Sequence, residues 1–142
     1  MPSTDQSKDI DAPISEVWSR FNNFHDLSWA PNVITKVEKI GDIDGGEVGA
    51  KRILNNAFHE TLVEINNNEY MLKYSIDDGP CPVSKEEVSN YYGVINLSPS
   101  TENNKTHVEW SSSWESKEED AVEFCHGIYV ALLNELAESF KR

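Results

Sequence analysis

The feature that most constrains the fold is a long helical pattern at residues 118–140. Apolar side chains recur there at spacings of three and four, which places them on one face of a helix: Ala121, Cys125, Ile128, Leu132 and Leu136. Ser116 and Glu119 have the spacing of a capping box at its start. About six turns of helix would span about 35 Å. Because so wide an apolar face is stable only when it is covered, the upstream residues must supply a surface for it.

Upstream of that helix, the hydrophobic period changes to two. We predict a weak first strand at residues 5–11 and further strands at residues 33–40, 47–54, 57–66, 69–76, 88–97 and 106–115. Turn signals such as Gly45-Gly46 and Asn66-Asn67-Asn68 separate these segments. In the last strand Val108, Trp110 and Trp114 alternate with polar residues, so this set should face the core. Strands joined by short turns pair as an antiparallel sheet.

Two short helices are predicted between the first and second strands. Pro13 opens the first, which presents Val17, Trp18 and Phe21. Residues 24–29 carry apolar side chains at a spacing compatible with a second, and Pro31 ends it. The predicted fold is therefore α+β: a helix-grip arrangement in which a curved seven-stranded antiparallel sheet wraps around the long C-terminal helix.

Composition indicates a single domain, residues 1–142, with a hydrophobic content of 38%. A net charge of -13 would repel nucleic acid and anionic lipid surfaces. We find no apolar run long enough to cross a membrane and no secretory signal, so we expect a cytoplasmic protein without membrane insertion, as monomer or homodimer. Cys81 and Cys125 are far apart in sequence and lack zinc-ligand spacing, so we expect no metal site. We also expect no cofactor, because the chain has neither a P-loop nor a GxGxxG motif.

Six segments, taken in order, carry a family resemblance: IDAPISEVWSRFNNFHDLSWAP, GGEVGAKRIL, YSIDDGPCPVS, NYYGVINLSP, THVEWSSSW and FCHGIY. Together they resemble the START-like (SRPBCC) superfamily of polyketide cyclases, dehydrases and lipid-transport proteins, in particular its small bacterial stand-alone members. The resemblance covers nearly the whole chain and implies a cavity between the sheet and the terminal helix that holds an apolar or amphipathic small molecule. The chain departs from the family pattern at residues 85–88, a charged extension that lengthens a loop at the expected mouth.

The resemblance also implies which side chains face that cavity. Carried over position by position, they are Trp29, Pro31, Glu60, Tyr74, Ile76, Tyr91, Gly93, Trp110, Phe124, Ile128 and Leu132. Glu60 is the candidate for chemistry, since Phe58 and Leu62 share its side of the strand and an apolar environment would raise the pKa of the carboxyl. A cationic partner, Lys51 or Arg52 on the neighbouring strand, would reduce or reverse that rise. A register shifted by one residue would instead turn Glu60 to water.

Three functions remain open at this point. The first is binding of an aromatic, polyketide-like or lipid-like molecule, which needs only an apolar lining and one or two polar anchors. The second is a cofactor-free cyclase, dehydrase or isomerase with Glu60 as general base and a tyrosine as partner. The third is an interaction module that uses an exposed apolar rim. We rank binding first, because the sequence offers one inward carboxylate and no convincing acid–base pair.

Overall fold

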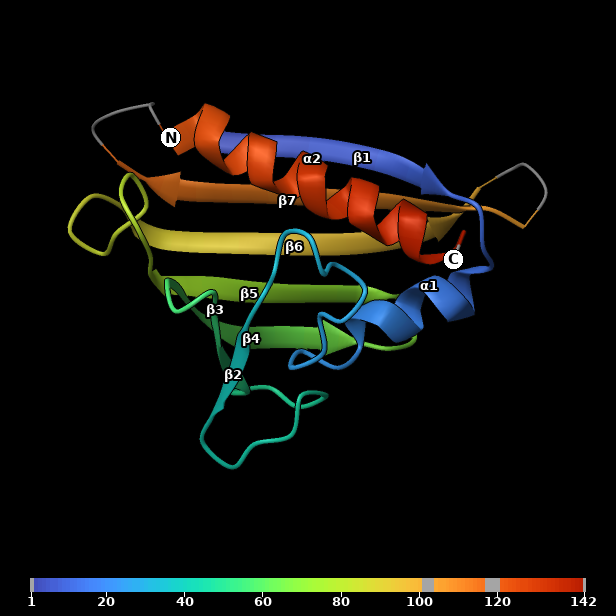
Figure 1. Cartoon of the computed structure of the whole chain (residues 1–142), viewed down its shortest axis with the longest axis horizontal. Helices are drawn as coiled ribbons and strands as arrows, with labels where there is room; N and C mark the ends of the chain where they lie inside the picture. The colour runs from blue at the N-terminus through green and yellow to red at the C-terminus, as the bar shows by residue number, and fades with distance from the viewer. Residues whose placement is uncertain (1, 101–103, 117–120, 142) are drawn as a thin grey trace.

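A computed structural model shows a seven-stranded antiparallel sheet and two helices within the residues that it describes, 2–100, 104–116 and 121–141. The strand order is β1-β7-β6-β5-β4-β3-β2. The strands are β1 (Ser3–Ile10), β2 (Val37–Ile40), β3 (Lys51–Leu54), β4 (Phe58–Asn66), β5 (Met71–Asp78), β6 (Ser89–Pro99) and β7 (Thr106–Glu115). The helices are α1 (Ile14–Phe21) and α2 (Ala121–Ser139). Because α2 lies across one face of the sheet (Figure 1), the helix-grip prediction is confirmed.

The strand alternation places a continuous apolar face under α2. In β7 the buried positions are Thr106, Val108, Trp110, Ser112 and Trp114, every second residue. The buried side chains of α2 are Ala121, Cys125, Tyr129, Leu132, Leu133 and Leu136. The buried face of the helix is therefore rotated slightly from the predicted one, which places Tyr129 in the core and leaves Ile128 partly exposed. The predicted helix start at residue 118 and the partner Glu119 of the capping box lie outside the described residues.

The predicted second short helix is wrong, because residues 22–34 form turns instead. Local polar side chains explain the difference. The Asn23 side chain accepts a hydrogen bond from the backbone N–H of His25 (3.0 Å), and that of Asp26 accepts one from Ser28 (3.0 Å). Such bonds satisfy backbone groups outside a helix and favour turns.

Several strand ends also differ from the prediction. β1 begins earlier, at Ser3, whereas β2 begins only at Val37 and β3 only at Lys51. Before β2, the Ala30 carbonyl accepts bonds from the N–H groups of Val33 and Ile34, which holds that segment in a turn. The predicted bounds of β7 match those observed.

Candidate functional site

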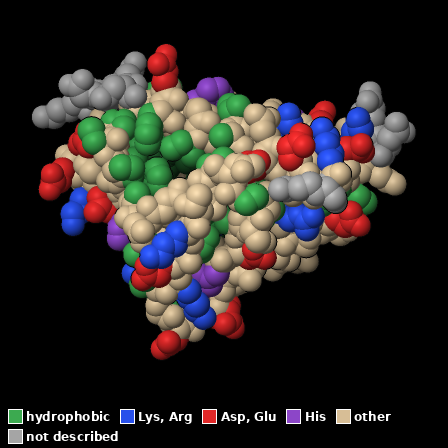
Figure 2. Space-filling model, viewed as in Figure 1, with side chains coloured by type: hydrophobic (Ala, Val, Ile, Leu, Met, Phe, Trp, Pro, Cys, Tyr) green, Lys and Arg blue, Asp and Glu red, His purple; other side chains and the backbone are tan. Residues whose placement is uncertain are grey.

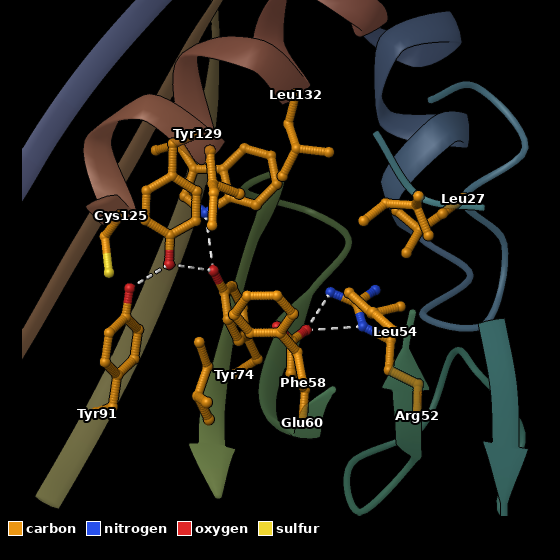
Figure 3. A pocket seen from close by; sticks show the side chains of 14 residues that line it. Leu27, Arg52, Leu54, Phe58, Glu60, Tyr74, Tyr91, Cys125, Tyr129 and Leu132 are labelled. Atoms are coloured by element: carbon orange, nitrogen blue, oxygen red, sulfur yellow. Dashed lines mark hydrogen bonds and ion pairs between the residues drawn. The ribbon is translucent and has the colours of Figure 1, made fainter. Parts of the chain in front are cut away.

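A cavity of about 40 Å³ lies between α2 and the concave face of the sheet (Figure 3). Its walls come from the loop before β2, from β3 to β7 and from α2. The lining residues are Leu27, Ile34, Arg52, Leu54, Phe58, Glu60, Tyr74, Ile76, Tyr91, Trp110, Cys125, Ile128, Tyr129 and Leu132. The volume corresponds to roughly three water molecules. It is small because large aromatic side chains fill most of the space that the fold encloses.

Three tyrosines from separate elements meet at one end of the cavity. The Tyr74 hydroxyl on β5 donates to the Tyr129 hydroxyl on α2 (2.8 Å), which lies 2.5 Å from the Tyr91 hydroxyl on β6. Trp110 Nε1 on β7 donates to Tyr74 Oη (3.0 Å). Figure 3 shows the three hydroxyl groups converging beside Cys125. The chain of hydrogen bonds ties the helix to the sheet at this point.

A close approach of backbone to ring positions Tyr74. Tyr74 and Gly93 are direct partners on β5 and β6, and a Cβ at Gly93 would clash with the Tyr74 ring. Only glycine therefore lets the ring lie flat over its neighbouring strand.

At the other end of the cavity, Glu60 on β4 forms a buried ion pair with Arg52 on β3. Arg52 Nε and Nη2 both donate to Glu60 Oε1, at 2.8 and 2.6 Å, and the two residues are cross-strand partners. Arg52 Nη1 donates to the Phe24 carbonyl (2.8 Å), and the guanidinium lies 3.7 Å from the centre of the Phe24 ring. The pair is therefore held by the loop before β2 as well as by the sheet.

The second carboxylate oxygen of Glu60 accepts no hydrogen bond from the residues that the structure describes. Both hydrogen bonds to this side chain end on Oε1. Glu60 is 6% exposed and lines the cavity. Figure 3 shows the carboxylate between Arg52 and Tyr74. An acceptor with free lone pairs thus borders the cavity.

Burial governs the protonation of these groups. It raises the pKa of Glu60 above the ordinary value, although the Arg52 charge and hydrogen bonds oppose the rise. Burial also raises the pKa of Tyr74, Tyr91 and Tyr129, so the phenols stay protonated at neutral pH. The pKa of Cys125 is raised for the same reason.

The structure brings together many of the residues predicted to face the cavity: Glu60, Tyr74, Ile76, Tyr91, Trp110, Ile128 and Leu132. Their role in binding stays a prediction. Four others lie elsewhere. Trp29 packs edge-on against Phe21 (5.4 Å between ring centres), Pro31 is exposed, Gly93 lies behind the Tyr74 ring, and Phe124 stacks on Phe58.

Several lining residues were not predicted to face the cavity, above all Tyr129 and Cys125. Cys125 was already on the predicted apolar face of the helix, and Tyr129, four residues later, lies on the same side, so the position of Cys125 was the signal for both. Arg52 was considered only as a partner of Glu60. Its alternation with exposed Lys51 was the signal that it points inward. Leu27 and Ile34 lie in the irregular segment before β2, whereas the apolar spacing had placed them in a short helix and a strand.

The described residues contain no group of three or more His, Cys, Asp and Glu side chains able to hold a metal ion. Neither of the two helices in the described parts of the chain is long and apolar enough to span a bilayer.

The fold and its enclosed cavity define a helix-grip protein, and comparison with known proteins agrees. Residues 1–141 match the family model described as polyketide cyclase/dehydrase and lipid transport. The chain belongs to this family.

Solved structures show the same architecture. A protein from Nitrosospira multiformis is 46% identical, with a TM-score of 0.95 over 98% of this chain and 96% of that one. The protein XoxI from Bacillus cereus is 30% identical, with a TM-score of 0.81 over 99% and 96%. Norcoclaurine synthase from Thalictrum flavum, solved with dopamine and hydroxybenzaldehyde, is 17% identical, with a TM-score of 0.74 over 96% and 84%, and shares the fold alone. A search of curated proteins finds no match.

Proposed function

We propose that this protein binds a small amphipathic molecule, with the polar end in the cavity beside Glu60 and the apolar part at the cavity mouth. The observation that carries the proposal is the free Oε2 of Glu60 within a largely apolar lining. A ligand donor at this oxygen would add a charge-assisted hydrogen bond to a carboxylate that has an unused acceptor. Apolar walls with a few fixed polar groups are typical of small-molecule sites.

The size of the cavity limits what it can enclose. Sites for drug-sized ligands are usually about 300–1,000 Å³, whereas this one is about 40 Å³. Only a small group fits inside without movement of the walls. Phe58, Ile76 and Ile128 line the cavity and remain partly exposed. Figure 2 shows hydrophobic side chains gathered between the N-terminal half of α2 and the segment before β2, where the body of such a ligand would lie.

Binding is favoured over catalysis by the partner of Glu60. General acid–base chemistry would need a second group beside Glu60 that can exchange a proton, whereas the residue bonded to Glu60 is Arg52, which stays protonated and whose charge opposes protonation of the carboxylate. The tyrosines donate to one another and have raised pKa values, so they are suited to positioning. Norcoclaurine synthase, with two small aromatic molecules bound, illustrates that this fold can hold such ligands.

The experiment is a titration with an apolar fluorescent probe, combined with native mass spectrometry for a co-purified small molecule. We expect one probe per chain, displaceable by small phenols. Ile128→Trp should block the mouth and abolish binding. Val130→Trp, on the exposed side of the same helix, is the matched control and should bind as the parent does. Equal binding by parent and Ile128→Trp would refute the site, and absence of any saturable binding would refute the function.

A further inference from the structure

The direction of the tyrosine hydrogen bonds determines what the cavity can offer a ligand. Trp110 Nε1 can only donate, so Tyr74 Oη accepts from it and passes its own proton to Tyr129. Tyr129 then donates to Tyr91, because otherwise its buried proton would have no acceptor. Tyr91 in turn contacts the Cys125 thiol. The protons of Tyr74 and Tyr129 are therefore used within the chain and are not available to a ligand.

The polar atoms that remain available between Tyr74 and Glu60 are acceptors. They are Glu60 Oε2 and the second lone pair of Tyr74 Oη. Three of the five N–H groups of Arg52 are directed at Glu60 Oε1 and the Phe24 carbonyl, and its guanidinium covers the Phe24 ring. A ligand group that enters on the Tyr74 side of Glu60, away from Arg52, therefore meets lone pairs and must bring the proton.

The charge of the site excludes ionic ligands. Arg52 and Glu60 together are neutral and buried, with side chains 8% and 7% exposed. An ammonium group would add an unpaired positive charge beside Arg52, and a carboxylate would face the lone pairs of Glu60. A charged ligand group of either sign would lose its hydration on entering the cavity and would not find enough hydrogen-bond partners there to replace it, so its binding would be weakened.

We propose that the ligand is a neutral molecule bearing an O–H or N–H donor, such as a phenol or alcohol, which donates to Glu60 Oε2. This inference rests on the proposed function and gives it a substrate class. The cavity would discriminate by hydrogen-bond direction: donors are accepted, whereas molecules of the same shape that only accept are not.

The test compares para-cresol with 4-fluorotoluene, which are similar in shape but differ in the donor. Both are titrated into the whole protein at pH 7, followed by calorimetry or amide NMR shifts. We expect para-cresol to bind at least about tenfold more tightly, as for a hydrogen bond to a charged acceptor. Protonated 4-methylbenzylamine and para-toluate should bind more weakly than para-cresol. Equal affinity for para-cresol and 4-fluorotoluene would overturn the inference and leave the binding function intact. If neither compound binds, the inference and the proposed function are both overturned.

Two variants test the assigned atoms. Arg52→Met combined with Glu60→Met removes both charges at similar volume and avoids an unpaired buried ion, so the preference for para-cresol should disappear. Tyr129→Phe removes the acceptor of the Tyr74 proton, so 4-methylacetophenone, a pure acceptor, should gain affinity relative to the parent. A preference that survives the double methionine variant, or no gain for the ketone, would show that other groups select the ligand.

Discussion

Arg52 donates two hydrogen bonds to one oxygen of Glu60, at 2.8 and 2.6 Å, and leaves the other oxygen facing the cavity. This asymmetry links the stability of the fold to the chemistry of the site. The same pair links neighbouring strands β3 and β4. The hydrogen bond from Arg52 to the Phe24 carbonyl also holds the loop before β2 against the sheet.

Breaking the pair on one side should be costly. Arg52→Met leaves the Glu60 charge buried without a partner, and we expect a loss of about 3–5 kcal/mol in the free energy of unfolding. The double variant Arg52→Met with Glu60→Met should recover stability to within about 1 kcal/mol of the parent. Urea denaturation of the parent and both variants measures this. A single variant as stable as the parent would show that the pair does not form.

The titration of Glu60 should make stability depend on pH. Because burial raises the pKa of this carboxyl above its ordinary value of 4.5, the folded protein holds the proton more tightly than the unfolded chain does. Its contribution to the free energy of unfolding is therefore complete below about pH 4.5 and is lost as the pH rises through the folded pKa.

Glu60→Gln cannot titrate and serves as the reference. Relative to it, the parent should lose stability as the pH rises above about 4.5, measured by urea denaturation at each pH. Carboxyl-carbon NMR of labelled glutamate gives the folded pKa directly. A stability difference that rises with pH over this range would mean that Arg52 outweighs burial and lowers the pKa.

Glycine at position 93 should be essential for the tyrosine chain. Gly93→Ala drives a methyl group into the Tyr74 ring, and we expect a loss of about 1–3 kcal/mol in the free energy of unfolding. Gly127→Ala is the control, because a Cβ there meets no atom within 4 Å and lies in a helix, so a gain of about 0.5–1 kcal/mol is expected. Thermal unfolding measures the change in stability of each variant relative to the parent. Gly93→Ala must be less stable than the parent and Gly127→Ala more stable, and any other result contradicts the prediction.

The two cysteines should differ in reactivity. Cys81 is exposed, whereas Cys125 is buried in the cavity wall, where burial raises the pKa of its thiol. In Cys81→Ser, modification of Cys125 by an alkylating reagent at pH 8 should be at least about tenfold slower than modification of Cys81 in Cys125→Ser. Mass spectrometry follows both rates. Saturating para-cresol should slow the alkylation of Cys125 further. An alkylation rate that para-cresol does not change would show that the ligand binds away from this part of the cavity wall.

The amino-acid sequence determined the architecture, since that depends on local periodicity. The period of two in β7 and of 3.6 in α2 is visible without any long-range contact, and a wide apolar helix face requires a sheet to cover it. The same alternation in β4 predicted that Glu60 would share the inner face with Phe58 and Leu62. Over residues 24–29 the pattern misled, because the polar side chains of Asn23 and Asp26 bond to nearby backbone and favour turns.

The tertiary structure alone decided how the inner face is used. Arg52 rather than Lys51 pairs with Glu60 because the β3–β4 register sets the two opposite each other with both side chains inward. Tyr129 joins Tyr74 and Tyr91 because α2 is rotated by part of a turn from its predicted orientation, which is set by packing against the sheet. The volume of the cavity depends on how closely side chains from five strands and a helix interdigitate. Such contacts join residues far apart in the chain, and no local pattern encodes them.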